Sequence, residues 1–179
     1  MSKEKRSMSM DDVETLHELL RLAIDDLKLC YADPDVEVGM DEWLAYDAVK
    51  NVCEVCLAGA LVLKGTHMAS AVPTAEAVAA GTAWSHQLID PGDDVRPWMR
   101  ALDYIRMGQL GLALDAMTEH LEESGIDQVP GHWKEASIQA LAEWRDEKFL
   151  RDTLGDYYSP GEMINRLEKR YELLKRHNL

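Results

Sequence analysis

The sequence predicts a mainly α-helical protein, a compact single-domain bundle of about six helices, on three observations. Apolar residues recur at steps of three and four along several segments, which is the spacing of one helix face. Helix start and stop signals stand at the ends of these segments. The 179 residues are 46% hydrophobic and 29% charged, which suits one ordinary globular domain. We expect a flexible basic N-terminus over 1–9 and one helical domain over 10–179.

The first helix is expected to begin with Ser9 as its N-cap. Asp11 and Asp12 would follow in the first turn, where carboxylates suit the positive end of the helix dipole. The Asp33-Pro34 pair predicts the end of this helix. Its expected buried face is made of residues at helical spacing, namely Val13, Leu16, Leu20, Ile24, Leu27 and Tyr31.

A second helix is expected from Asp41 to Lys64, with Gly65 closing it. Between Val55 and Leu63 the sequence is apolar on every side, and such a helix is stable in water only when it is surrounded. We therefore predict that this helix is the core element of the fold. The residues expected to be nearly fully buried are Val52, Val55, Cys56, Leu57, Ala60 and Leu61.

The middle of the chain predicts irregular structure and then a helical hairpin. A loop is expected over 66–73, a short helix over 74–81 and a turn over 90–93. Residues 95–124 predict an αα-hairpin of two helices that meet at Gly108. The residues expected on one face of its second helix are Leu110, Ala113, Leu114, Met117 and Leu121.

Two more helices are predicted in the last third of the chain. The first follows the turn at 129–131, contains Trp133 and Trp144 on one face, and stops at Gly155. The second has Ser159 as N-cap and Pro160 at the first helical position, with Glu162 completing a capping box. Its expected apolar face consists of Met163, Ile164, Leu167, Tyr171 and Leu174.

The charge of the chain indicates what kind of partner it can bind. The net charge is −14, which repels nucleic acid and anionic lipid, so neither direct nucleic-acid binding nor a membrane partner is expected. Residues 11–42 carry eleven acidic residues against Arg21 and Lys28, whereas the stretch from Gly161 onward has an excess of two positive charges. We expect a protein partner with a basic surface. Pairing of the two charged ends in a homodimer stays open.

The acidic residues of the first helix are the candidate binding surface. The candidates are those of one helical stripe and the loop that follows it, namely Asp11, Glu14, Glu18, Asp25, Asp33, Asp35 and Glu37. A concentrated negative field speeds the encounter with a positively charged partner. The alternative is that this stripe is only a solvated helix face.

The Cys53-x-x-Cys56 pair allows three kinds of chemistry, each with an element missing. A structural zinc site needs four ligands, and beyond these cysteines there are only Cys30 and six histidines without paired spacing. A redox dithiol needs a strand before the helix that carries the cysteine, and no strand is predicted there. A nucleophilic Cys56, which resembles the cysteine helix of papain-like hydrolases, would need His86 or His132 as base.

We therefore expect Cys53 and Cys56 to be apolar core residues. No metal or other cofactor is expected, with Cys30, Cys53 and Cys56 as the only candidate ligands.

Two local resemblances accompany these predictions. Tyr104, Gly108, Leu110, Ala113 and Met117 resemble one tetratricopeptide-like hairpin, and no second copy follows, so the resemblance implies helix packing only. The segment CEVCLAGA over 53–60 resembles small uncharacterised proteins encoded by tailed phages, which implies a phage or prophage origin and no known activity.

The sequence favours an interaction protein over an enzyme. Phosphate loops, nucleophile elbows, paired zinc-protease histidines and dinucleotide fingerprints are all absent from it. The amino end has no secretory signal, and no apolar run approaches the roughly 20 residues of a membrane span, so a cytoplasmic location is expected. We expect a non-enzymatic acidic protein that binds a basic surface, as an inhibitor or nucleic-acid mimic. The alternative is a cysteine-dependent hydrolase or a metal-binding protein that uses Cys53 and Cys56.

Overall fold

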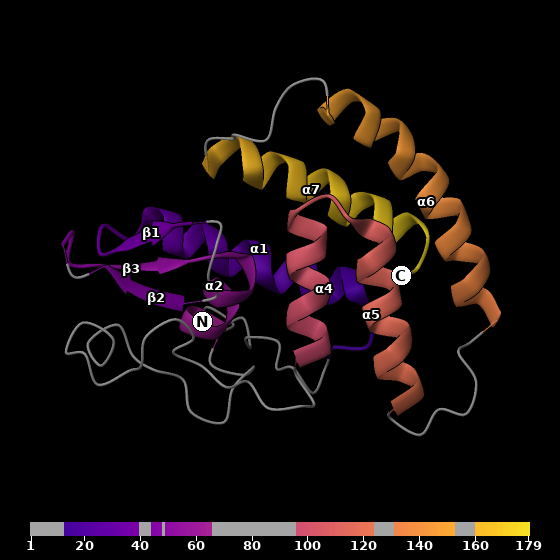
Figure 1. Cartoon of the computed structure of the whole chain (residues 1–179), viewed down its shortest axis with the longest axis horizontal. Helices are drawn as coiled ribbons and strands as arrows, with labels where there is room; N and C mark the ends of the chain where they lie inside the picture. The colour runs from indigo at the N-terminus through magenta and orange to yellow at the C-terminus, as the bar shows by residue number, and fades with distance from the viewer. Residues whose placement is uncertain (1–12, 40–43, 48, 66–95, 124–130, 153–159) are drawn as a thin grey trace, which may run out of the picture.

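The computed structural model describes residues 13–39, 44–47, 49–65, 96–123, 131–152 and 160–179. This part of the chain is mostly helical, which confirms the predicted fold class, and it also contains a small sheet (Figure 1). The helices are α1 (Leu16–Ala32), α2 (Leu57–Gly65), α4 (Arg96–Arg106), α5 (Leu110–Glu123), α6 (Gly131–Asp152) and α7 (Pro160–Arg176). The strands are β1 (Val36–Val38), β2 (Leu44–Asp47) and β3 (Val52–Val55).

Helix α1 begins later than the sequence predicted, because a stronger cap lies further along the chain. Thr15 is the N-cap: its hydroxyl accepts from the Glu18 backbone N–H (3.3 Å), while the Glu18 carboxylate accepts from the Thr15 N–H (3.1 Å). In this capping box two side chains satisfy two backbone N–H donors, whereas a start at Ser9 would offer only the Ser9 side chain. Ser9 itself lies outside the described residues, and Val13 and Glu14 precede the helix.

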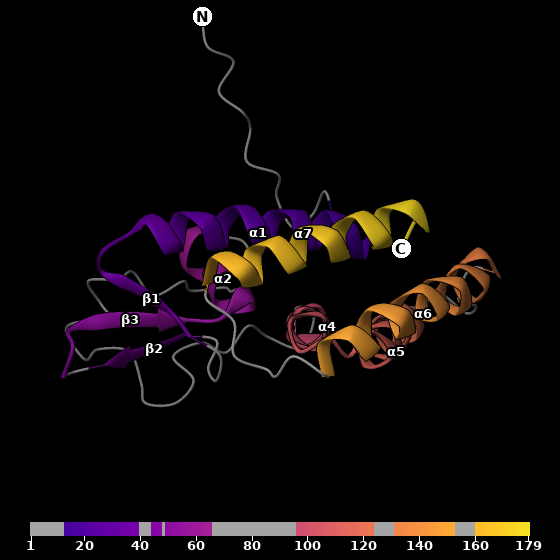
Figure 2. The ribbon, with the colours of Figure 1, turned by 90° about the horizontal axis from the view of Figure 1, so that it is seen from above.

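The buried face of α1 is confirmed except at its last position. Val13 and the predicted leucines and isoleucine are buried, but Tyr31 is 56% exposed. Cys30 is fully buried and takes the last inward position, and the helix ends at Ala32 as the Asp33-Pro34 pair predicted. Through this face α1 packs against α2, and it also runs beside α7, as both views of the ribbon show (Figures 1 and 2).

The predicted helix over 41–64 is wrong in its first half. The described residues there form the antiparallel hairpin of β2 and β3, and α2 begins only at Leu57. The turn explains this: the Asp47 carboxylate accepts from the N–H groups of Val49 (2.9 Å) and Lys50 (3.1 Å), and Asn51 has a left-handed φ of 55°. Side chains that bond nearby backbone groups compete with the helix ladder. Val52 and Val55 of β3 are β-branched, and such residues favour a strand.

The burial predicted for this region holds although the helix does not. Val55, Cys56, Leu57, Ala60 and Leu61 are all nearly fully buried, while Val52 is only half-buried. The strand ends at Val55 and the helix starts at Leu57, so both elements direct apolar side chains into the same core. Gly65 ends α2 as predicted.

The sheet has the order β1-β3-β2, with β1 parallel to β3 and β2 antiparallel to it. Its inner face presents Val36, Leu44, Cys53 and Val55 to the core under α1 and α2. Side chains alternate across a strand, so Glu37 and Glu54, which are register partners, lie on the outer face. The sheet therefore has an apolar inner face toward the core and an acidic outer face.

The αα-hairpin over 95–124 is confirmed as α4 and α5, which meet at Gly108. Gly108 has a φ of 77°, which a glycine adopts without strain. The Trp144 indole N–H of α6 donates to the Gly108 carbonyl (2.8 Å), so the hairpin turn is tied to the next helix. Of the face predicted for α5, Leu110, Ala113, Leu114 and Met117 are buried, and the Leu121 side chain lies outside the description.

Helix α7 starts at Pro160 as predicted, and one of its cations lies in the core. Arg170 is 1% exposed; its Nη1 donates to the carbonyls of Ile105 (2.8 Å) and Arg106 (3.0 Å) at the end of α4. Its guanidinium carbon lies 5.1 Å from the Trp144 ring centre. A cation at a helix carboxyl end stabilises the helix dipole. Arg170 therefore joins α4, α6 and α7 and does not contribute to a basic surface.

Several predicted features lie outside the described residues. These are the N-terminal segment 1–9, the loop over 66–73, the helix over 74–81, the turn over 90–93, Gly155 and Ser159. Among the described helices, none combines the length and the apolar character needed to cross a bilayer.

Candidate functional site

The α1 part of the predicted acidic stripe is largely used inside the fold. Asp11 lies outside the described residues, and Glu14 is exposed just before the helix. The Glu18 carboxylate turns back onto the backbone, accepting from the N–H groups of Glu14 (2.9 Å) and Thr15 (3.1 Å), and these bonds lower its pKa. Glu18 is therefore a cap, and its charge is committed to the helix start.

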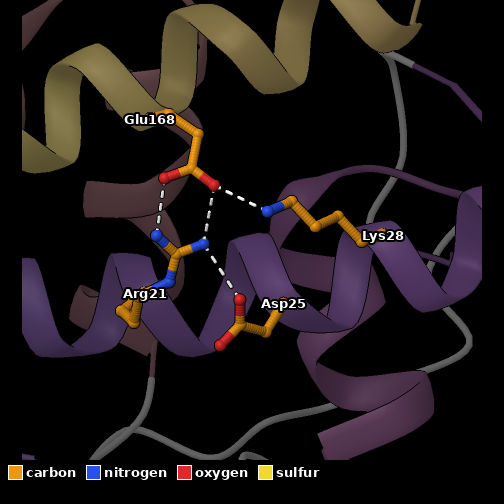
Figure 3. A network of polar contacts seen from close by, with 4 residues as sticks. All are labelled: Arg21, Asp25, Lys28 and Glu168. Carbon is orange, nitrogen blue, oxygen red and sulfur yellow. Dashed lines mark hydrogen bonds and ion pairs between the residues drawn. The ribbon is translucent and has the colours of Figure 1, made fainter.

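Asp25 belongs to an ion-pair network between α1 and α7 (Figure 3). Arg21 donates to both oxygens of Glu168 (2.6 and 2.9 Å) and to Asp25 (2.9 Å), and Lys28 also binds Glu168 (2.7 Å). The hydrogen bonds from Arg21, with those from Lys28, lower the pKa of Glu168 to about 2. Two cations thus interrupt the stripe, so this side of α1 serves to hold α7.

The loop residues of the prediction lie together at the small sheet. Asp33 binds Lys64 (2.8 Å), and this hydrogen bond lowers the pKa of the Asp33 carboxyl. Glu37 accepts from Lys50 (3.1 and 3.2 Å), and Asp35 is exposed in the loop before β1. Of the seven predicted residues, Asp33, Asp35 and Glu37 are the ones that lie at the small sheet.

The sheet adds two carboxylates that the sequence analysis missed, Asp47 and Glu54. The Lys50 ammonium has its pKa raised by the Glu37 hydrogen bond first, and also by the fields of Asp47 and Glu54. Three carboxylates therefore surround one exposed lysine. We call Asp33, Asp35, Glu37, Asp47 and Glu54 the acidic sheet surface. The alternation of Val36-Glu37-Val38 and of Cys53-Glu54-Val55 is the signal that could have found it, because alternating polarity is typical of strands.

All three cysteines are core residues, which the sequence analysis expected of Cys53 and Cys56. Cys30, Cys53 and Cys56 are buried free thiols. Burial is the main cause that raises the pKa of Cys30 and of Cys56 to about 12, and it also raises the pKa of Cys53. A nucleophile or metal ligand must be a thiolate, so these surroundings disfavour both roles.

The reason given against a redox dithiol was wrong in one respect. A strand does precede the helix: Cys53 lies in β3, and Cys56 stands between β3 and α2. Helix amino ends lower thiol pKa values, and the N–H groups of Ala58 and Gly59 act in this direction on Cys56. Burial outweighs them, and the neighbouring Asp103 carboxylate, 3.7 Å from the sulfur, raises the pKa further.

The histidines that the structure describes do not supply the partners that cysteine or zinc chemistry needs. His67 and His86 lie outside the described residues. His132 and His177 lie together between α6 and the end of α7, and His17 bonds the backbone oxygen of Leu179 (2.7 Å). Within the described ranges, no three His, Cys, Asp or Glu side chains are grouped so that they could hold a metal ion.

Comparison with known proteins adds no relative: no protein-family model matches this chain, and neither the curated proteins nor the solved structures contain a significant match. Function must therefore be argued from the site itself.

Proposed function

We propose that this protein is a non-enzymatic interaction protein that binds a basic surface of a partner protein through its acidic sheet surface. The supporting observation is the gathering of five carboxylates on β1, β2, β3 and their loops, against two lysines, Lys50 and Lys64. Glu37 and Glu54 are register partners on the outer face of the sheet, and Asp35 is exposed in the loop before β1, so the negative field there favours the approach of a partner's lysines and arginines.

The proposed binding surface lies on the sheet and not on the α1 stripe. On α1, Glu18 caps the helix and Asp25 pairs with Arg21, so neither is available without a cost to the fold. A reversal of Glu18 to lysine would break the capping box, which is worth about 1 kcal/mol. On the sheet, Asp35 is exposed and forms no ion pair with a described residue, and Glu37 pairs with the exposed Lys50, a kind of pair that contributes little to stability.

The rival function, a cysteine-dependent hydrolase or a metal-binding protein, has no supporting geometry among the described residues. Its thiols are buried with raised pKa values, as described above. A nucleic-acid mimic remains one form of the proposed function, because carboxylates spaced over a surface can occupy a site that normally holds phosphates.

The test compares two triple variants with the same change in net charge. The sheet variant carries Asp35→Asn, Glu37→Gln and Glu54→Gln. The matched control carries Asp115→Asn, Glu119→Gln and Glu172→Gln, three exposed carboxylates on α5 and α7. Each tagged full-length chain is used to capture proteins from a lysate of its host at low and at high salt.

The expected result is a basic protein that the parent and the control capture at low salt, that high salt releases, and that the sheet variant captures weakly. With the purified partner, the association rate should fall as salt rises, and the fall should be flatter for the sheet variant. Equal capture by both variants, or capture that salt does not affect, would reject the acidic sheet surface. Competition by duplex DNA for the same partner would identify the mimic.

A further inference from the structure

An open cleft lies between α6 and the end of α7. These two segments lie at the end of the molecule away from the sheet (Figure 1). Its volume is about 220 Å³. Apart from Ala136, its lining is polar: His132, Glu135 and Gln139 come from α6, and Arg176, His177 and Asn178 from the end of α7. The cleft is independent of the acidic sheet surface.

The α6 wall of the cleft is held by two tryptophans on another face of the same helix. The Trp133 indole N–H donates to the Thr118 hydroxyl of α5 (3.3 Å), and the Trp144 indole N–H donates to the Gly108 carbonyl (2.8 Å). Both rings are buried. Because these contacts fix the rotation of α6, its polar row is directed into the cleft.

The opposite wall is held by the chain that follows α7. Asn178 has a left-handed φ of 55°, which turns the chain so that the Leu179 N–H reaches the Leu174 carbonyl (3.0 Å). Leu179 is fully buried, and its backbone oxygen accepts from the His17 N–H (2.9 Å) and from His17 Nδ1 (2.7 Å). Sites on fixed elements bind with a smaller entropy cost than sites on loops.

Glu143 positions the two basic groups of the cleft. One of its oxygens accepts from Arg176 Nη2 (2.8 Å) and the other from His177 Nε2 (2.9 Å), and these bonds lower the Glu143 pKa. Glu135 lies on the α6 wall and makes no hydrogen bond or ion pair with any residue that the structure describes. The two walls therefore present opposite charges, a guanidinium on one and a carboxylate on the other.

We propose that this cleft is a binding site for a free α-amino acid, with the ligand carboxylate on Arg176 and its ammonium on Glu135. A simple anion could pair with Arg176 but not with Glu135, and a simple cation could pair with Glu135 but not with Arg176, whereas a zwitterion pairs with both walls at once. The volume is below the roughly 300 Å³ at which drug-sized pockets begin, so the ligand is small. The amides of Gln139 and Asn178 suit a polar ligand side chain.

The experiment is an amide NMR titration of the full-length chain with the common L-amino acids. Acetate and inorganic phosphate serve as anions, and methylammonium serves as the cation. At least one amino acid should shift the backbone amides of His132, Gln139 and Asn178 in a saturable way. Glu135→Gln and Arg176→Gln should each weaken this binding about tenfold, because each removes one charge-assisted contact.

The matched control is Glu119→Gln on α5, which removes one exposed carboxylate outside the cleft and should leave the affinity unchanged. Arg176→Gln also removes a bond to Glu143, so Glu135→Gln, which loses no intramolecular bond, is the decisive variant. The proposal is overturned if no amino acid shifts these amides, if acetate or phosphate binds equally well, or if Glu135→Gln binds like the parent. None of these results bears on the acidic sheet surface.

Discussion

Asp26 on α1 is a half-buried carboxyl whose ionisation opposes folding. Burial, followed by the charge of Asp25, raises its pKa to about 7, although Lys64 acts in the opposite direction. An acid with a raised pKa in the folded state binds its proton more tightly there than in the unfolded chain. Stability is therefore lost as the pH rises from the unfolded value of 3.8 through 7, and the penalty is constant above that.

The prediction is that Asp26→Asn stabilises the protein increasingly from pH 5 to pH 8, because asparagine cannot ionise. With a discount for partial exposure, the gain at pH 8 should be about 1–2 kcal/mol. Urea unfolding at several pH values measures it, with Asp115→Asn, an exposed carboxylate on α5, as control. A gain of the same size at pH 5 and pH 8 would show that the carboxyl is not desolvated.

At the scale of elements, the contact between α1 and α7 depends on one carboxylate bound by two cations. Glu168→Gln removes the charge that Arg21 and Lys28 share. All three side chains are partly exposed, so the loss should be about 1 kcal/mol, and less at high salt. The Glu168 pKa is lowered to about 2, so its contribution is complete above the unfolded value of 4.5 and disappears as the pH falls to about 2.

Urea unfolding of Glu168→Gln at pH 7 and at low pH tests this contact. The variant should be less stable than the parent at pH 7, and the two should converge as the pH approaches 2. Glu172→Gln, an exposed α7 carboxylate that pairs with no other described residue, should behave like the parent throughout. A loss that is the same at both pH values would instead indicate that Glu168 acts through packing.

At the scale of the whole molecule, the three thiols should report global unfolding. Cys30 lies on α1, Cys53 on β3 and Cys56 before α2, and all are buried in one core. We expect the native protein to react slowly with a thiol reagent, and the rate to rise steeply across the urea transition. An added exposed thiol, Glu119→Cys, should react at once. Fast reaction of a native thiol would contradict the burial and revive the cysteine-enzyme alternative.

Local sequence signals were enough to predict a helix end wherever a residue that starts or stops a helix stands at that end. Gly108 marks the α4–α5 turn, Pro160 marks the start of α7, and the Asp33-Pro34 pair marks the end of α1, all as predicted. The same kind of signal also explains the error at the start of α1, since Thr15 and Glu18 form a complete capping box that Ser9 cannot match. The mainly helical class was readable from the chain because helical periodicity is a local property.

Only the tertiary structure decided which elements the described residues between Gly39 and Leu57 form and which partners the charged side chains bind. The stretch Val52–Val55 could have belonged to a helix or to a strand, and pairing with β1 and β2 selected the strand. Arg170 is one of the positive charges from Gly161 onward and is a core residue, because the carbonyls that bind it come from a helix more than sixty residues earlier in the sequence. On α1, Asp25 pairs with Arg21, and Arg21 and Lys28 in turn bind Glu168 of α7. The composition of the sequence therefore determined how many apolar and charged residues the chain has. Which of them are buried and which charges are paired depended on contacts between residues distant in the chain.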